Sequence, residues 1–274
     1  MARGRRRAGF LLCWPAAMAP DQSPPLQLRF YGDLGALLKH PARLRETVLY
    51  PLARRASIKD IIESLGIPHT EIGRLQSAGG EVGFSFLPAP GDRVDVHPVG
   101  GDLLPTAATV LRPEPLRAYR FLVDVNVSRL ASLLRMAGFD AASVREQGNL
   151  TSRSAVASAA RQQERILVSR DRELLKLRTV IHGRLIRNQD PTRQLHEVVT
   201  VYRLQLLARP FSRCMKCNLP LAPVAKEAIL SRLEPLTKKY YSVFSRCPQC
   251  ENIYWQGSHY ERMLKILDKS EVLR

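Results

Sequence analysis

The stretch RFLVDVNVSRLASLLRMAGFD, residues 120–140, contains the features that decide the fold. Its apolar start ends abruptly at Asp124, and a helical pattern follows within a few residues. Apolar residues then recur at the spacing of one helix face, at Leu130, Leu133, Leu134 and Ala137. Gly138 stops this helix. A buried strand followed by a crossover helix is the unit of a parallel sheet, whose functional residues lie at the carboxyl ends of strands.

The same alternation of strands and helices continues through residues 118–208. We expect further strands at residues 141–144, 166–169 and 179–186. We expect the helices at residues 152–165, 172–178 and 191–207. The pattern therefore predicts an α/β domain with a parallel sheet.

Three carboxylates follow the predicted strands: Asp124, Asp171 and Asp190. If their strands are neighbours, Asp124 and Asp171 project into one crevice. Carboxylates gathered there repel each other unless a divalent cation is shared, and Mg²⁺ or Mn²⁺ prefers such oxygen ligands. Ions held in this way orient a water molecule and stabilise charge on a phosphodiester.

Each of these aspartates also has a structural interpretation. Asp171 suits the N-cap of a helix that begins at Arg172, and Asp190 precedes Pro191, the favoured pair of cap and first helical residue. Asp124 has no obvious capping role. From pattern alone, a shared metal site and separate helix caps both stay open.

Residues 26–99 predict a small α+β domain. LQLRFYG and ETVLYPL alternate like the two strands of a hairpin. SIKDIIESLGI is a helix with Ser57 as its N-cap and Gly66 as its stop. EVGFSFLPAPGDRVDVHPV closes the unit with two strands around a Pro-Gly turn. Strand, strand, helix, strand, strand is the order of a β-grasp fold.

Two other segments have the composition of connections or leaders. Residues 100–117 contain three prolines and two glycines without an amphipathic period, so we expect an interdomain linker. Residues 1–25 imitate a secretory signal, with four arginines before a short apolar stretch. Because Pro15 interrupts that stretch and Met18 offers a second start, we interpret it as a disordered or misassigned leader.

Four of the five cysteines form two CxxC pairs, separated by 29 residues. The pairs are Cys214 with Cys217 and Cys247 with Cys250. Four thiolates at this spacing suit a tetrahedral structural zinc, which predicts a zinc ribbon with an inserted helix over residues 209–274. Two disulfides or a redox site are the alternatives. Two disulfides would leave Cys13 without a partner, and neither CxxC pair lies in the βαβ pattern that is typical of a redox site. A zinc site implies a reducing compartment, so we expect a cytoplasmic protein.

The charge balance favours a polyanionic partner. Lys and Arg number 42 against 25 Asp and Glu, for a net charge of +17, and RNA is the partner we expect. Candidate contacts to substrate beside the predicted crevice are Arg170, Asn126 and Arg129. No apolar run approaches the ~20 residues that span a bilayer, so we expect no membrane association.

The sequences of several segments resemble those of known protein families. LRFYGDL, SIKDIIESLGIPHTEIG and PGDRVDVHPV resemble the ubiquitin-like domain of mut-seven C-terminal-domain proteins, which is related to small sulfur carriers. FLVDVNVSRLASLLRMAGFDA, ILVSRDRELLKLR, LIRNQDPTRQLHEVV and CPQCENIYWQGSHYERM resemble the mut-seven C-terminal RNase family. That resemblance implies a PIN-like nuclease fold joined to a zinc ribbon. It also implies Mg²⁺ or Mn²⁺ at an acidic site, with Asp124 and Asp171 as ligands and Asp190 as a weaker third.

The sequence departs from the family pattern in one place. Members of the family have an acidic cluster near the start of the second helix, where this chain has GNLTSRSAVASAA with Thr151, Ser152 and Ser154. Hydroxyl groups replace an anionic ligand poorly, and Glu146 lies several residues too early. The leading hypothesis is therefore a metal-dependent ribonuclease with an incomplete acidic cluster. A non-catalytic RNA-binding protein is one alternative.

A second alternative is an adaptor whose β-grasp domain recruits a partner enzyme. The Gly100-Gly101 pair matches the end of the sulfur carriers, but here the chain continues, so no terminal carboxylate exists. The aromatic residues near the second CxxC pair also allow two interpretations. Tyr254, Trp255, His259 and Tyr260 either stack on unpaired bases or pack the ribbon against its neighbour, and packing is favoured because such small domains have little core.

Overall fold

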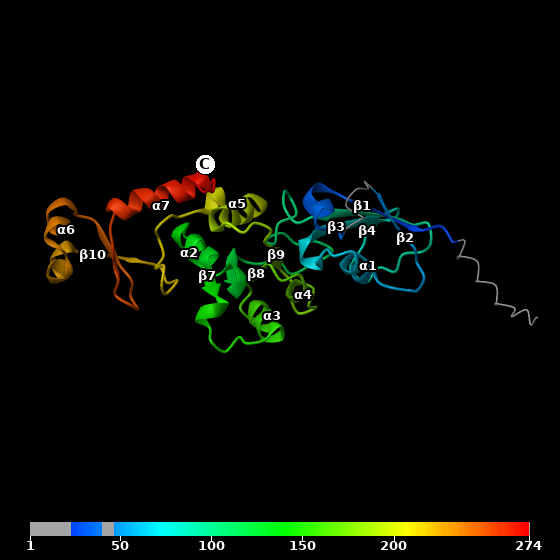
Figure 1. Ribbon diagram of the computed structural model, residues 1–274, viewed down its shortest axis with the longest axis horizontal. Coiled ribbons are helices and arrows are strands. Elements are labelled where there is room, and N and C mark those ends of the chain that lie inside the picture. The colour runs from blue at the N-terminus through cyan, green and yellow to red at the C-terminus, as the bar shows by residue number, and fades with distance from the viewer. Residues whose placement is uncertain (1–22, 40–46, 274) are drawn as a thin grey trace, which may run out of the picture.

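The computed structural model describes residues 23–39 and 47–273 (Figure 1). The leader expected at the N-terminus lies outside the described residues as far as residue 22. Figure 1 shows three parts in a row: a β-grasp unit, a parallel-sheet unit and an outlying ribbon. The C-terminal helix α7 (Ser258–Lys269) runs from the ribbon back to the parallel-sheet unit.

The β-grasp unit has one five-stranded sheet in the order β2-β1-β5-β3-β4. Its strands are β1 (Leu26–Phe30), β2 (Thr47–Tyr50), β3 (Ile72–Ser77), β4 (Gly80–Glu81) and β5 (Arg93–Pro98). β1 pairs in parallel with β5, as the β-grasp order requires. Helix α1 (Ile58–Ser64) starts as expected, because the Ser57 side chain accepts a hydrogen bond from the backbone of Asp60.

One strand of this sheet was not expected from the sequence. We expected two strands within residues 81–99, but the structure has β3 at Ile72–Ser77 and only two residues of β4. The segment IGRLQS carries polar side chains that are only half-buried, so its alternation is weak. Its pairing with β5 is what makes it a strand.

The second unit contains the expected parallel sheet, in the order β7-β6-β8-β9. Its strands are β6 (Arg120–Val123), β7 (Asp140–Ser143), β8 (Ile166–Ser169) and β9 (Gly183–Leu185). Its helices are α2 (Arg129–Met136), α3 (Arg153–Gln162), α4 (Arg172–Leu175) and α5 (Pro191–Tyr202). Helix α5 is shorter than expected because Arg203 adopts a left-handed conformation (φ 51°), after which the chain forms a 3-10 helix at Leu204–Leu207.

Alternate residues of the parallel strands enter two different apolar cores. Phe121 and Val168 face the core covered by α2, α5 and the end of α7. Leu122, Leu167 and Leu185 face the other side, where one continuous cluster also contains the apolar residues of β1, α1 and β5. The β-grasp unit and one face of the parallel sheet therefore share a core.

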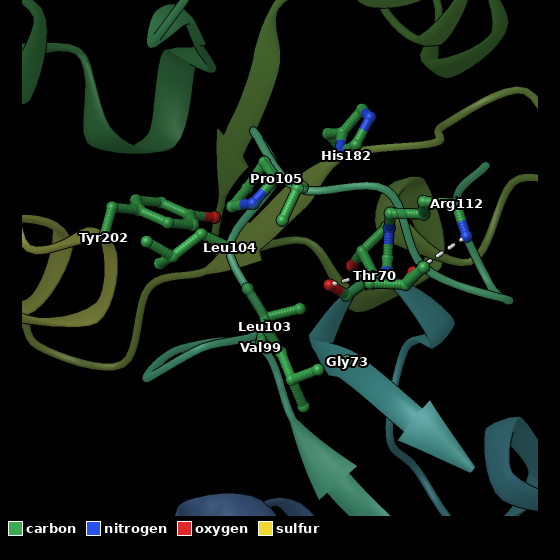
Figure 2. A pocket seen from close by; sticks show the side chains of 12 residues that line it. Thr70, Gly73, Val99, Leu103, Leu104, Pro105, Arg112, His182 and Tyr202 are labelled. Atoms are coloured by element: carbon green, nitrogen blue, oxygen red, sulfur yellow. Dashed lines mark hydrogen bonds between the residues drawn. The ribbon is translucent and has the colours of Figure 1, made fainter. Parts of the chain in front are cut away.

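Polar contacts fasten the same junction. The 3-10 helix His69–Glu71 lies beside β9, and the Glu71 carboxylate accepts hydrogen bonds from Arg184 Nη1 and the backbone of Leu185, both at 2.7 Å. In the segment between the units, the Arg112 guanidinium donates to the carbonyls of Ile72, Thr70 and His69 on one side and of Ile181 on the other. Figure 2 shows Arg112 beside Thr70. Residues 100–117 therefore connect the two units along the chain and also contribute a buried arginine that hydrogen-bonds to both.

The third unit is a small antiparallel ribbon in the order β10-β11-β12. Its strands are β10 (Ala222–Val224), β11 (Phe244–Arg246) and β12 (Ile253–Tyr254). The expected inserted helix occurs as two short pieces, a 3-10 helix at Lys226–Arg232 and α6 (Pro235–Tyr240). Among the helices that the structure describes, none is long and apolar enough to cross a membrane.

Gly138 provides a direct test of the fold. It ends α2 with φ at +96°, and a Cβ there would lie 2.2 Å from the carbonyl oxygen of Arg209. Gly138→Ala is expected to lower the free energy of unfolding by at least about 2 kcal/mol, since backbone strain and a backbone clash both act. Gly148→Ala is the control, because a Cβ there meets nothing within 4 Å. Urea denaturation that showed equal losses for the two variants would contradict this account.

Candidate functional site

The structure brings Asp124 and Asp171 to the same edge of the parallel sheet. Strands β6 and β8 are neighbours, and the backbone N–H of Asp124 donates to the carbonyl of Val168 at 3.0 Å. The Ser169 hydroxyl donates to Asp124 Oδ2 at 2.6 Å and accepts from the backbone N–H of Asp171 at 2.9 Å. One buried hydroxyl therefore links the two aspartates. The sequence predicted that the two aspartates lie at one edge if their strands are adjacent, but it did not indicate the hydroxyl group between them.

Asp124 is held by hydrogen bonds on both carboxylate oxygens. Only 6% of the residue is exposed. Oδ1 accepts from the backbone of Val125 at 2.7 Å, and Oδ2 accepts from Asn126 Nδ2 at 2.8 Å as well as from Ser169. Asp124 is thus the N-cap of a 3-10 helix, Val125–Val127, a role that the sequence did not indicate.

Asn126 connects the same two strand ends from the outside. Its amide nitrogen lies 2.8 Å from Asp124 Oδ2 and 3.3 Å from Ser169 Oγ, and its Oδ1 accepts from the backbone N–H of Arg170 at 3.1 Å. The Asn126 side chain therefore hydrogen-bonds the loop after β6 to the loop after β8 and fixes the position of Asp124. Its predicted contact with substrate stays a prediction.

Asp171 has two kinds of partner. Its Oδ1 accepts from the backbone N–H groups of Glu173 and Leu174, so it caps α4. Its Oδ2 accepts from Arg153 Nε at 2.6 Å. Burial tends to raise the pKa of Asp171, but the bonds from Arg153 and from the cap outweigh it and hold the pKa below its usual value. Asp171 is therefore a stable carboxylate that already has a cationic partner.

Arg153 is the site residue that sequence reasoning missed. It is the first residue of α3, in the segment where the resemblance to the mut-seven C-terminal RNase family predicts an acidic cluster. The hydrogen bond and charge of Asp171 raise the pKa of Arg153, and the charge of Asp124 acts in the same direction. The sequence did contain a signal, since an arginine stands in the segment where acidic residues are expected.

Two further acids that the sequence brought into question have other partners. Asp190 is an exposed N-cap of α5 and accepts from the backbone of Arg193 at 3.0 Å. Glu146 binds the buried guanidinium of Arg135. Over residues 23–39 and 47–273, the only group of three or more His, Cys, Asp or Glu placed to share a metal ion is formed by cysteines. Asp190 therefore acts as a helix cap, and its role as a third metal ligand stays a prediction.

The surface around this edge is basic. Arg129 and Arg170 are exposed, and the Arg153 side chain is 60% exposed despite its ion pair. Arg170 directly precedes Asp171, and Arg129 is the first residue of α2, after the 3-10 helix that Asp124 caps. The candidate RNA contacts thus stand at the acidic edge, and their role stays a prediction.

The four cysteines of the ribbon form a group that is positioned to bind a metal ion. The sulfur atoms of Cys214, Cys217, Cys247 and Cys250 all lie within 4.8 Å of one another, and none is in a disulfide. Cys214 Sγ lies 3.6 Å from Cys250 Sγ. A tetrahedron with Zn–S bonds of ~2.3 Å has sulfur–sulfur edges of roughly 3.8 Å, so the arrangement is consistent with zinc.

The two cysteine turns repeat one backbone geometry. In each turn the first cysteine's carbonyl accepts from the residue after the second cysteine, Asn218 or Glu251, at 2.9 and 3.0 Å. Both of these residues have positive φ, 63° and 56°. The Tyr254 hydroxyl lies 3.2 Å from Cys214 Sγ, so this tyrosine supports the centre.

The first cysteine turn is fastened to the parallel sheet. Asn218 Oδ1 accepts from the backbone of Ala141 on the edge strand β7, and its amide donates to Asp140. The buried Arg135 donates to the carbonyls of Met215 and Lys216. The cysteine centre is therefore attached to the parallel-sheet unit.

The three units together define a class of protein: a PIN-like α/β fold with linked aspartates at its strand ends, preceded by a β-grasp domain and followed by a ribbon with a four-cysteine group. Comparison with protein families agrees with this class. The model of the Mut7-C RNase domain matches residues 119–267, and the model of the Mut7-C ubiquitin domain matches residues 23–103. The chain belongs to the Mut7-C RNase-domain family. A search of curated proteins and a search of solved structures each returned no match to the chain.

Proposed function

We propose that this chain binds RNA at the aspartate edge of its parallel sheet without a metal ion there, and that it hydrolyses RNA poorly or not at all. The observation that carries the proposal is the ion pair between Arg153 Nε and Asp171 Oδ2, at 2.6 Å. A guanidinium placed there supplies the positive charge that a catalytic cation would otherwise bring. The edge thereby retains a nuclease-like site for nucleic acid, while metal-dependent hydrolysis at that site is weakened.

The hydrogen bonding of the two aspartates supports this proposal. Both oxygens of Asp124 and both oxygens of Asp171 accept at least one hydrogen bond from protein donors. Mg²⁺ demands near-ideal octahedral oxygen ligands and gives up its water reluctantly. An ion entering between these carboxylates would have to displace Arg153 and meet its positive charge.

The basic residues support RNA as the ligand. The net charge of the chain is +17, the exposed Arg153 pairs with Asp171, and the exposed Arg129 and Arg170 are near Asp124 and Asp171 in the sequence. Guanidinium groups bind phosphate oxygens in two-pronged hydrogen bonds, which fix the backbone without reading its sequence. The site therefore suits the ribose-phosphate backbone.

Metal-dependent hydrolysis is the second candidate. The linked positions of Asp124 and Asp171 favour it, and so does the exposure of Arg153, which has room to swing away. Asp124 and Asp171 would then hold Mg²⁺ or Mn²⁺, which would activate water and offset charge on the phosphodiester. At the ribbon, we propose that the four cysteines bind zinc in a structural role, because four thiolates leave no open position for a substrate.

The β-grasp domain as a recruiting adaptor has less support. Its β1, α1 and β5 share one apolar cluster with the parallel sheet, so a large part of its apolar surface is already covered within the chain. This arrangement favours a structural contribution of the domain over recruitment of a partner enzyme.

The proposal is tested by reversing one charge. Arg153→Glu is expected to weaken binding of single-stranded RNA, measured by fluorescence anisotropy without added divalent ions, by about tenfold through the loss of a charge-assisted contact. The same variant is expected to gain Mn²⁺ binding in calorimetry, because a third carboxylate joins Asp124 and Asp171. The matched control is Arg161→Glu, an exposed arginine at the other end of α3 with the same change of charge.

Cleavage distinguishes the two candidates. Wild type is expected to leave RNA intact in Mn²⁺ at the level of Asp124→Asn and Asp171→Asn. Cleavage by wild type that both variants abolish would establish the ribonuclease and overturn the proposal. Equal RNA affinities for Arg153→Glu and Arg161→Glu would also overturn it, because Arg153 would then make no specific contact.

A further inference from the structure

The ribbon carries a groove with exposed aromatic rings, far from the aspartate edge along the chain. The groove has a volume of about 460 Å³ and lies between α6, β12 and the start of α7. We call it the aromatic groove and define it by Leu236, Tyr240, Tyr241, Trp255, His259 and Met263. Its residues come from segments that Figure 1 places at the outer end of the molecule.

Some of the aromatic residues nearby are already committed to the fold. Tyr254 hydrogen-bonds Cys214 through its hydroxyl, and the Tyr260 ring lies 4.4 Å from the Phe211 ring. These two contacts agree with the packing role expected for the group. They leave Tyr240 and Trp255 as the large exposed rings of the groove, with 67% and 40% of the residue exposed.

The Trp255 ring is exposed but held in place. Its centroid lies 6.4 Å from that of Phe244, which is buried. On another side, a Cβ at Gly257 would lie 2.7 Å from Trp255 Nε1, so only a glycine permits this close packing. A ring that is held in place and partly exposed loses little conformational entropy when a flat group stacks on it. Trp255 is therefore built like a stacking platform.

The charge around the groove identifies the kind of occupant. Residues 209–274 contain 12 Lys and Arg against 6 Asp and Glu. Lys238 and Lys239 lie in the last turn of α6, and the Lys239 ammonium lies 5.3 Å from the Tyr240 ring centroid. Arg262 is exposed on α7. The acids Glu234 and Glu261 are also exposed, but the positive charges outnumber them.

We propose that the aromatic groove binds unpaired bases of single-stranded RNA, with Trp255 and Tyr240 stacking on bases and Lys238, Lys239 and Arg262 contacting phosphates. Every base has a flat face, so stacking on aromatic side chains tolerates any sequence, and nearby cations follow the backbone. A duplex hides these faces and is not a ligand of the groove. The proposal rests on RNA as the ligand of the chain, but it does not need the aspartate edge.

The experiment uses the tryptophan as its own reporter. The chain has two tryptophans, Trp14 and Trp255. In a Trp14→Phe background, oligouridylate is expected to quench the remaining fluorescence, and duplex RNA of the same length is not. Trp255→Ala and Tyr240→Ala in the full chain are expected to weaken oligouridylate binding by about tenfold each, measured by anisotropy. Tyr240→Phe keeps the ring and is expected to keep the affinity.

A matched surface change controls for exposed apolar area. Leu206→Ala alters a residue that is 92% exposed outside the ribbon, and it is expected to leave RNA binding unchanged. Circular dichroism and zinc content of each variant establish that the ribbon is intact. Thermal unfolding of the intact variants is expected to match wild type.

The outcomes separate this proposal from the proposed function. Loss of affinity in the Trp255 and Tyr240 variants, with none in Arg153→Glu, supports the groove and overturns the aspartate edge as an RNA site. Unchanged affinity in both groove variants overturns the groove while Arg153→Glu still tests the edge. Equal quenching by duplex RNA overturns stacking. Self-association that Trp255→Ala abolishes without changing RNA affinity would show that the groove contacts another protein chain, which also overturns the proposal.

Discussion

Cys247→Ser is expected to abolish metal binding at the four-cysteine centre and to unfold the ribbon. Cys247 is fully buried, and its sulfur is one of four within 4.8 Å of one another. A structural zinc contributes an apparent binding free energy of about 10–16 kcal/mol in zinc-finger peptides, so its loss exceeds what a domain this small can supply from its core. The measurements are zinc content by atomic absorption and thermal unfolding of the full chain.

The effect is expected to spread beyond the ribbon. The carbonyls of Met215 and Lys216 are acceptors for the buried guanidinium of Arg135, and Asn218 pairs with the edge strand β7. Disorder of this turn removes partners from groups inside the parallel-sheet unit. Cys13→Ser is the control, because this cysteine belongs to neither CxxC pair. A Cys247→Ser protein that retained one zinc per chain and its unfolding temperature would contradict the assignment.

Arg184→Met is expected to lower the free energy of unfolding by about 3–5 kcal/mol, because it leaves the Glu71 carboxylate buried without its nearest cation. Arg184 is 3% exposed and Glu71 is 1% exposed, and they are 2.7 Å apart across the junction of the β-grasp unit and the parallel sheet. Arg187→Met is the control, since the Arg187 side chain is 28% exposed and lies 3.8 Å from Glu71. Urea denaturation measures both.

The pH dependence of the Arg184→Met variant provides a second readout. Burial raises the pKa of Glu71 even in the presence of Arg184. Without Arg184 the folded-state pKa lies further above the ordinary value near 4.5, so the folded variant favours the protonated acid. Its stability is therefore greatest below about pH 4.5 and falls as the pH rises through the folded-state pKa. A loss that is the same at pH 4.5 and pH 8 would contradict a buried charge as the cause.

Strong local signals in the sequence predicted much of the fold. The paired cysteines, the helix after Asp124 and the Ser57 cap depend on short-range patterns, and each occurs where the sequence indicated. Strand β3 does not have such a pattern, because its half-buried polar residues are fixed by pairing with β5. Tertiary structure supplied that element.

The candidate site shows the same division. The sequence placed Asp124 and Asp171 at neighbouring strand ends, which follows from the rule for parallel sheets. It did not show the hydrogen bond from the Ser169 hydroxyl to Asp124 or the Arg153 guanidinium on Asp171, because these contacts join residues that are 45 and 18 positions apart in the sequence. Arg112 was missed for the same reason, since a charged residue in a proline-rich connection resembles a solvated one.

The apolar cluster that continues from β1, α1 and β5 into Leu122, Leu167 and Leu185 has a consequence for how this chain evolves. Two domains that share an apolar core cannot be exchanged independently of each other. A substitution in the shared layer must suit two neighbours at once, and removal of the β-grasp unit would expose the apolar face of the sheet to water. Transfer of either domain into another protein therefore requires substitutions in this shared apolar layer.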